Sequence, residues 1–108
     1  MPHIRVRGME KENIKEISKE LIDDLEKIIE CPRDYFTLEC INTTFIVDGE
    51  EDSAYPFIDV LWFERGEEVR TKVAKAITER VNKFDYEDVC VMFTNLDKEL
   101  YYENGEHF

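Results

Sequence analysis

The residue with the most distinctive potential chemistry is Pro2, because its chemistry depends on its place in the chain. The sequence begins Met1-Pro2-His3, and removal of Met1 leaves the ring nitrogen of Pro2 as a free secondary amine. An α-amino group has an ordinary pKa of roughly 7.7–8.0, which burial or a neighbouring cation lowers. A neutral amine at this position can act as a general base near pH 7. Alternatively, Pro2 only begins an edge strand, where its missing N–H is tolerated.

The other reactive residue types form no recognised catalytic or metal-binding pattern. The three cysteines, Cys31, Cys40 and Cys90, lack the spacing of metal ligands. Cysteine in strands is commonly a small buried hydrophobe. The acidic segment Asp48–Asp52 does not fit the spacing of a calcium-binding loop, and no phosphate-binding loop or serine-centred elbow is present. We therefore expect neither a metal nor a cofactor.

Composition limits the classes of partner. A chain of 108 residues with 43% hydrophobic residues suits one domain, which we place at 1–108. The net charge of −12 argues against nucleic acid and anionic membranes as partners, because phosphates require a basic surface. No apolar run is long enough to span a membrane, and no signal peptide is evident. We therefore expect a cytoplasmic protein with reduced thiols.

Two amphipathic helices are predicted from apolar residues at spacings of three and four. The first runs from Glu10 to Glu30 and ends at Cys31-Pro32, because proline disfavours helical geometry in the residue before it. The second follows Gly66 and has Glu67 and Glu68 in its first turn, where acids interact well with the helix dipole. The two stripes are Ile14, Ile17, Leu21, Leu25 and Ile28, and Val69, Val73, Ile77, Val81 and Phe84.

Four strands are predicted around these helices, in the order strand, helix, strand, strand, helix, strand. The first strand begins at Pro2, and the other three cover 35–47, 56–63 and 89–93. An acidic loop is predicted at 48–53. Pro2, Ile4 and Val6 recur as Pro56, Ile58 and Val60 at an offset of 54, which indicates an internal repeat. Two βαβ units of this kind give an α/β fold, with a four-stranded mixed sheet and both helices on one face. A ferredoxin-like fold shares this element order, so the order alone does not choose between them.

The predicted sheet has one face that no helix covers. Alternation along the strands places Arg5 and Arg7 on this face, near Glu39 and Asp59 as opposite charges. The same face carries several apolar side chains: Ile41, Phe57, Leu61, Phe63 and Met92. It is too apolar to remain in water. We therefore predict that this face is the interface of a closed oligomer.

Three segments resemble the tautomerase superfamily, in its macrophage migration inhibitory factor and hydroxymuconate isomerase branches. They are Pro2-His3-Ile4-Arg5-Val6, Cys31-Pro32-Arg33-Asp34-Tyr35 and Asn104-Gly105-Glu106-His107-Phe108. The whole chain looks most like a bacterial family of unknown function within that superfamily. The resemblance implies a homotrimer whose sheets line a central channel, with Pro2 as the catalytic base at each subunit boundary.

The resemblance also implies roles for some other residues. Gly66 matches a glycine beside the pocket, which would place Arg65 next to Pro2. Tyr35 matches an aromatic position of the cytokine branch. The lysine, tyrosine and asparagine of that branch are replaced here by Cys31, Cys90 and Met92. Arg65 or Arg33 is then a candidate for the missing cation, because guanidinium binds carboxylates bidentately; a surface or intersubunit salt bridge is the alternative role for each arginine.

The sequence thus predicts a small-molecule enzyme or a protein that kept the fold without the chemistry. In the first case, Pro2 catalyses enol–keto tautomerisation of a carbonyl compound that bears a carboxylate. Arg65, Arg33, or Tyr101 or Tyr102 of a neighbouring subunit then binds the anion, and Tyr35 contributes to the pocket. In the second case, the chain is a non-catalytic trimeric binding or scaffold protein. The aromatic tail is expected to dock on a neighbour or to close the pocket.

Overall fold

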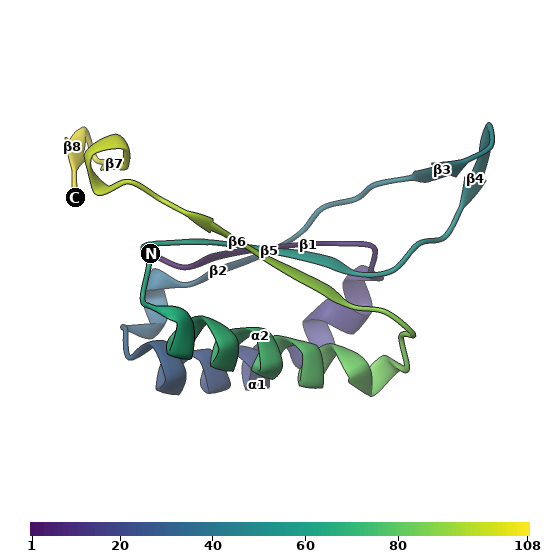
Figure 1. Cartoon of the computed structure of the whole chain (residues 1–108), viewed down its shortest axis with the longest axis horizontal. Coiled ribbons are helices and arrows are strands. Elements are labelled where there is room, and N and C mark those ends of the chain that lie inside the picture. The colour runs from purple at the N-terminus through teal and green to yellow at the C-terminus, as the bar shows by residue number, and fades with distance from the viewer.

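A four-stranded mixed sheet is covered on one face by two helices (Figure 1). The computed structural model covers all 108 residues. The sheet has the order β2-β1-β5-β6, in which β1 pairs in parallel with β2, β5 in parallel with β6, and β1 antiparallel with β5. Its strands are β1 (His3–Arg7), β2 (Thr37–Cys40), β5 (Phe57–Trp62) and β6 (Cys90–Asn95). The predicted pair of βαβ units is therefore confirmed.

Each helix connects the two parallel strands of one unit. The helices are α1 (Lys11–Ile29) and α2 (Glu67–Val81), and three short 3₁₀ helices follow α1, α2 and β6: η1 (Arg33–Tyr35), η2 (Asn82–Phe84) and η3 (Lys98–Leu100). The left-handed backbone of Glu30, with φ of 59°, ends α1 just before Cys31-Pro32. Neither helix is long and apolar enough to cross a membrane.

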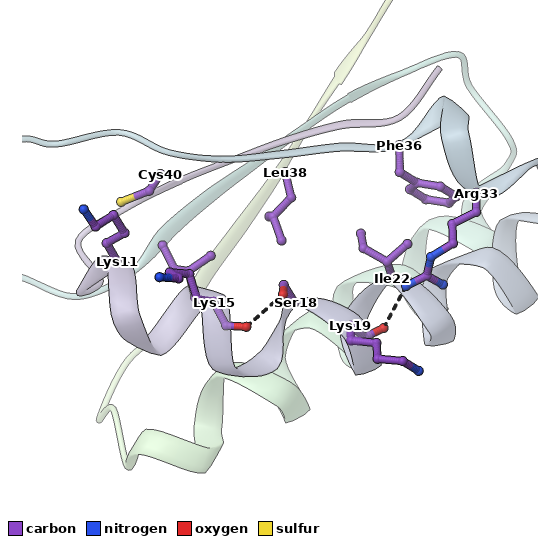
Figure 2. Close-up of a pocket in the computed structure, with 10 residues that line it drawn as sticks. Lys11, Lys15, Ser18, Lys19, Ile22, Arg33, Phe36, Leu38 and Cys40 are labelled. Atoms are coloured by element: carbon purple, nitrogen blue, oxygen red, sulfur yellow. Dashed lines mark hydrogen bonds between the residues drawn. The ribbon is translucent and has the colours of Figure 1, made fainter.

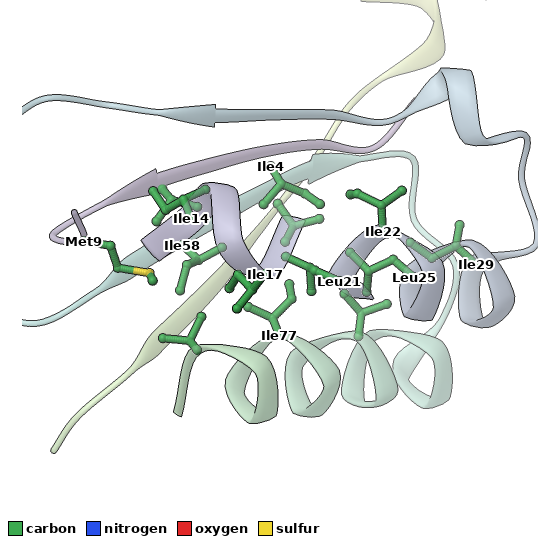
Figure 3. Close-up of a cluster of buried hydrophobic side chains, with 14 of the residues drawn as sticks. Ile4, Met9, Ile14, Ile17, Leu21, Ile22, Leu25, Ile29, Ile58 and Ile77 are labelled. Carbon is green, nitrogen blue, oxygen red and sulfur yellow. The ribbon is translucent and has the colours of Figure 1, made fainter. Parts of the chain in front are cut away.

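The hydrophobic core lies between the sheet and the helices (Figure 3). Alternate residues of β1 and β5 point into it, so Ile4, Ile58, Val60 and Trp62 are fully buried. The helix stripes supply the opposite side of the core, and its buried helix residues are Ile14, Ile17, Leu21, Ile22, Leu25, Ile29, Val73, Ile77 and Val81. Burial of such side chains stabilises a fold by about 1.5–3 kcal/mol each.

The internal repeat is visible in matched backbone contacts. Pro2 and Pro56 precede the two central strands, and both are among the most fully buried residues of the chain. The Pro2 carbonyl accepts a hydrogen bond from the Thr37 N–H at 3.1 Å, and the Pro56 carbonyl accepts one from the Cys90 N–H at 3.0 Å. The two βαβ units therefore begin in the same way.

The prediction for residues 35–53 was wrong. The expected strand at 35–47 is interrupted, because β2 ends at Cys40 and a separate strand, β3 (Phe45–Val47), begins five residues later. Half of the expected acidic loop forms a strand, because β4 (Glu50–Asp52) pairs antiparallel with β3. Asp48 and Gly49 form the turn with φ of 51° and 81°, a combination typical of tight hairpins.

Two extensions flank the face of the sheet that the helices leave open. The β3–β4 hairpin rises from one end, and a tail containing β7 (Tyr102–Glu103) and β8 (Glu106–His107) rises from the other (Figure 1). Between them, Arg5 Nε donates to Glu39 Oε1 at 3.0 Å within the same chain. The tail covers part of the open face, because Phe63 is only 8% exposed beneath it.

Candidate functional site

Pro2 lies at the start of the central strand β1, where the tail comes closest to the sheet. Its side chain is fully buried, and Met1 before it is half-buried. Burial, followed by the positive charge of Arg65, lowers the pKa of the Met1 amino group from its ordinary value of 8.0. The Met1 amino group is therefore less basic than an ordinary amino terminus.

Arg65 reaches this location from the turn between β5 and α2. Gly66 adopts a φ of 92°, which favours glycine, and donates its N–H to Glu64 Oε1 at 2.8 Å. That hydrogen bond is the main cause of a lowered pKa of the Glu64 carboxyl. Glu64 also accepts a hydrogen bond from Arg70 Nη1 at 3.1 Å. Arg65 itself is exposed and forms no ion pair, so its guanidinium is free to bind an anion.

A hydrogen-bonded chain of three side chains lies beside Pro2. His3 Nδ1 is 2.6 Å from Thr37 Oγ1, and His3 Nε2 is 2.7 Å from the Tyr101 hydroxyl. The His3 and Tyr101 rings stack with their centroids 5.9 Å apart. Burial lowers the pKa of the His3 imidazole and raises that of the Tyr101 phenol. Both groups are therefore held in their neutral forms near pH 7.

The tail is attached to the sheet by an aromatic cluster. Tyr101 and Phe108 each contact Phe63, with ring centroids 5.4 Å apart in both pairs. The Lys98 ammonium lies 5.7 Å from the centre of the Phe63 ring. These contacts come from the same chain, so the tail borders the amino terminus of its own subunit.

The remaining residues predicted for the site lie elsewhere. Arg33 binds Asp23 and Glu26 of α1 and donates to the Lys19 carbonyl. Tyr35 lies in η1 with 40% of its surface exposed, and Tyr102 is 63% exposed against the His107 ring. The structure therefore gathers Arg65 and Tyr101 around the amino terminus, whereas Arg33 faces α1 and Tyr102 the tail hairpin.

Sequence reasoning missed His3 as a site residue. No role in the site was predicted for it, yet it is the side chain that connects β1, β2 and the tail. The available signals were a histidine next to Pro2 and a tail rich in tyrosine. Neither signal shows that His3 and Tyr101 are hydrogen-bonded to each other. No group of three or more His, Cys, Asp or Glu side chains is arranged to hold a metal ion.

Sequence comparison identifies one family. A family model described as "Domain of unknown function (DUF1904)" matches residues 1–107. A solved structure of such a domain from Sebaldella termitidis is 49% identical in sequence, with a TM-score of 0.95 and 100% of both chains covered. None of the curated proteins matches the chain.

More distant structures share the fold. An asymmetric trimer of wild-type F6 fused 4-OT is 14% identical, with a TM-score of 0.82 over 97% of this chain and 94% of the other. A macrophage migration inhibitory factor-like protein from Entamoeba histolytica is 19% identical, with a TM-score of 0.65 over 99% and 98%. The fold is therefore that of the 4-OT/MIF tautomerase superfamily, as the sequence resemblance implied.

Proposed function

The chain belongs to the family described as domain of unknown function DUF1904, and from that premise we propose that it is a cofactor-independent tautomerase. Its reaction is enol–keto tautomerisation of a small carbonyl compound that carries a carboxylate. Pro2 is the general base, once Met1 has been removed. With Met1 attached, the Pro2 nitrogen is an amide whose lone pair is delocalised, so it cannot accept a proton.

The observation that carries this proposal is the environment of the amino terminus. Partial burial and the charge of Arg65 lower the pKa of the Met1 amino group, and we expect the same two effects on the amine that removal of Met1 leaves on the buried Pro2. A lowered pKa increases the fraction of neutral amine near pH 7, and only the neutral amine accepts a proton. The fold by itself would not support this function, because one fold hosts many activities.

Each neighbouring residue has a separate role in the proposed reaction. The Pro2 nitrogen removes the proton of the enol hydroxyl, and the resulting pyrrolidinium returns a proton to carbon, so the reaction is an isomerisation with no other product. Arg65 binds the substrate carboxylate through its unpaired guanidinium. The Tyr101 hydroxyl, held by His3 at 2.7 Å, donates a hydrogen bond to the oxygen on which negative charge develops.

We propose that the working form is a homotrimer assembled through the open face of the sheet. That face retains half-buried apolar residues, among them Phe57, Leu61 and Met92, which favour contact with another subunit. The fused 4-OT of the same fold forms a trimer. Sedimentation at micromolar concentration tests this assembly, and a stable monomer would contradict it.

The test of function pairs two proline variants. Protein with Met1 removed, as verified by mass spectrometry, is assayed with phenylenolpyruvate. Pro2→Ala is expected to lower the rate by about 10²–10⁴, the usual contribution of a positioned acid or base. Pro56→Ala removes the equivalent buried proline of the second unit and is expected to leave the rate nearly unchanged. Equal rates for wild type and Pro2→Ala would contradict catalysis by Pro2.

One observation favours a second candidate, a non-catalytic trimeric binding or scaffold protein. Pro56 is as fully buried as Pro2, although its nitrogen lies within the chain and cannot act as a base. A buried proline at the start of a strand therefore does not require catalysis. Absence of turnover in protein that is trimeric and free of Met1 would support this candidate.

A further inference from the structure

A groove between α1 and the edge strand β2 forms a separate site on the opposite side of the sheet from the tail. Its volume is about 770 Å³, within the usual range of small-molecule sites. It extends along α1 from Lys11 to Ile22, a length of roughly 16 Å at 1.5 Å per residue. Figure 2 shows its lining, with Lys11 and Cys40 at one end and Arg33 and Phe36 at the other. Neither Pro2 nor Arg65 lines it.

The charges that line this groove are all positive. Lys11, Lys15, Lys19 and Arg33 contribute four cations, and no Asp or Glu lines the groove. This is unexpected in a chain whose acids outnumber its bases by 26 to 14. The lining therefore favours anionic ligands, although the chain as a whole is acidic.

The cations differ in how freely they can bind a ligand. Arg33 is held by Asp23 and Glu26, and Lys19 also pairs with Asp23. Lys15 has only a long contact of 3.5 Å with Glu12, and Lys11 has no ion pair. The available positive charge is therefore concentrated at the Lys11 end.

The middle of the groove is apolar, and an aromatic ring lies beside the paired Arg33 at its far end. Leu38 lies between the two ends, and Phe36 closes the end next to Arg33 (Figure 2). Ile14 and Ile22 of α1 form the facing wall. A ligand that fits this arrangement has an anionic head and an elongated apolar body.

The second βαβ unit provides an internal comparison. The equivalent groove between α2 and β6 has a volume of about 430 Å³ and a mixed lining that includes Arg70, Lys75 and Glu79. Phe93 is its only large apolar side chain. A cationic and apolar groove is therefore a property of the first unit's sequence and not of the repeated fold.

We propose that the α1–β2 groove binds an amphipathic carboxylate, a small molecule with an elongated aliphatic or aryl body. The carboxylate contacts Lys11 and Lys15, and the body lies along Leu38 towards Phe36. Binding here is independent of the reaction proposed at Pro2, because the two sites share no residue.

The probe is decanoate, added to the assembled full-length protein below its micelle concentration. Binding is measured by NMR shifts of backbone amides and by protection of Cys40 from iodoacetamide in a Cys31→Ser/Cys90→Ser background. Cys40 is the exposed cysteine at the Lys11 end of the groove. We expect saturable shifts in α1 and β2 together with slower alkylation of Cys40.

Two lysine variants test the role of charge. Lys11→Glu is expected to weaken decanoate binding about fivefold, because it reverses an exposed charge beside the carboxylate. Lys75→Glu is the matched control, since Lys75 is also exposed on a helix but lines the other groove, and it should leave binding unchanged. Leu38→Ala should weaken decanoate binding without altering the weak binding of acetate.

Several outcomes would overturn the proposal. They are the absence of saturable binding, binding that leaves Cys40 unprotected, and equal losses in Lys11→Glu and Lys75→Glu. Uncharged decanol binding as tightly as decanoate would also overturn it, because the lysines would then contribute nothing. The tautomerase assay is unaffected by any of these results, so failure of this proposal is distinguishable from failure of the proposed function.

Discussion

The two βαβ units of this chain share a framework but differ at their ends. Ile4 and Val6 in the first unit match Ile58 and Val60 in the second, and all four are at most 3% exposed. The difference lies before the central strands. Pro56 follows the β3–β4 hairpin, whereas Pro2 follows Met1, whose removal frees the Pro2 nitrogen. The same buried proline is therefore a structural residue in one unit and a candidate base in the other.

The segments that follow the edge strands differ as well. The hairpin after β2 points away from the sheet, and its Ile46 is 63% exposed. The tail after β6 folds back, so that Tyr101 contacts His3 and Phe63. The amino-terminal end of β1 is thus bordered by aromatic residues of the tail, whereas the aromatic contacts at the other end involve Phe45, Tyr55 and Phe57. The repeat supplies the scaffold, and the departures from the repeat supply the candidate site.

The largest expected effect comes from making Pro2 chemically equivalent to Pro56. Insertion of one lysine between Met1 and Pro2 keeps the Pro2 nitrogen in an amide, as it is in Pro56. Phenylenolpyruvate turnover should then fall by at least about 10²-fold. Circular dichroism and the thermal midpoint should match wild type, because the proline still begins the strand. Retained turnover would show that the proposed base is wrong.

A core substitution in each unit tests whether the two units, whose central strands are equally buried, contribute equally to stability. Ile4→Ala and Ile58→Ala each remove a fully buried side chain and should each lower the free energy of unfolding by about 2–5 kcal/mol. Urea denaturation at one fixed protein concentration measures both, because assembly makes stability depend on concentration. If one substitution lowers the free energy of unfolding more than twice as much as the other, the two units do not contribute equally to stability.

Sequence patterns predicted the parts of the chain that are governed by local periodicity. The helix stripes and the alternation of Ile4, Val6, Ile58 and Val60 identified most of the core, although the stripes missed Ile22 and Ile29. The interruption after Cys40 was missed, because Phe45–Val47 is as β-prone as β2 and composition does not reveal where a chain leaves a sheet. The Asp48-Gly49 pair was an available hairpin signal, but the acidic residues around it suggested a loop.

The candidate site was predictable only in part. Pro2 and Arg65 could be selected because their positions in the chain and at a glycine turn have chemical meaning. The contact between His3 and Tyr101 joins residues 98 positions apart and depends on the path of the tail. No local pattern encodes that path, so the hydrogen-bonded chain at β1 emerges only in three dimensions.

Removal of the tail tests the difference between the two extensions. Deletion of residues 100–108 exposes the Phe63 ring, which is otherwise 8% exposed. The free energy of unfolding should fall by about 1.5–3 kcal/mol, the usual contribution of one buried aromatic side chain. Chemical denaturation measures the loss, and sedimentation shows whether assembly also changes. An unaltered deletion variant would mean that the tail stabilises nothing.

A single hydroxyl provides a finer test of the tail contact. Tyr101→Phe removes the hydrogen bond to His3 Nε2 and should cost about 0.5–1.5 kcal/mol of stability. Tyr102→Phe is the matched control, because Tyr102 lies in the same tail, is 63% exposed and has no hydrogen bond through its hydroxyl. Equal effects of the two variants would show that the hydrogen bond between Tyr101 and His3 does not stabilise the tail.

The smallest expected effect is a pH dependence that belongs to the first unit alone. Position 3 carries His3, whereas the equivalent position of the second unit carries Phe57, which does not titrate. Burial, followed by the positive amino terminus, lowers the pKa of folded His3 below its ordinary value of 6.5. The folded state therefore prefers neutral imidazole, so stability is complete above pH 6.5 and declines as the pH falls through 6.5 towards the lowered pKa.

His3→Gln separates this contribution from those of other groups, because glutamine keeps hydrogen-bonding capacity without titrating in this range. The thermal midpoint of wild type should fall slightly between pH 7 and about pH 5.5, before carboxylates begin to titrate. The variant should show a smaller fall over the same interval. The difference should be less than the loss caused by Tyr101→Phe, because His3 is only partly buried and solvent screens its interactions. An identical pH profile in the variant would assign the decline to groups outside the His3–Tyr101 contact and leave the two units electrostatically alike in this range.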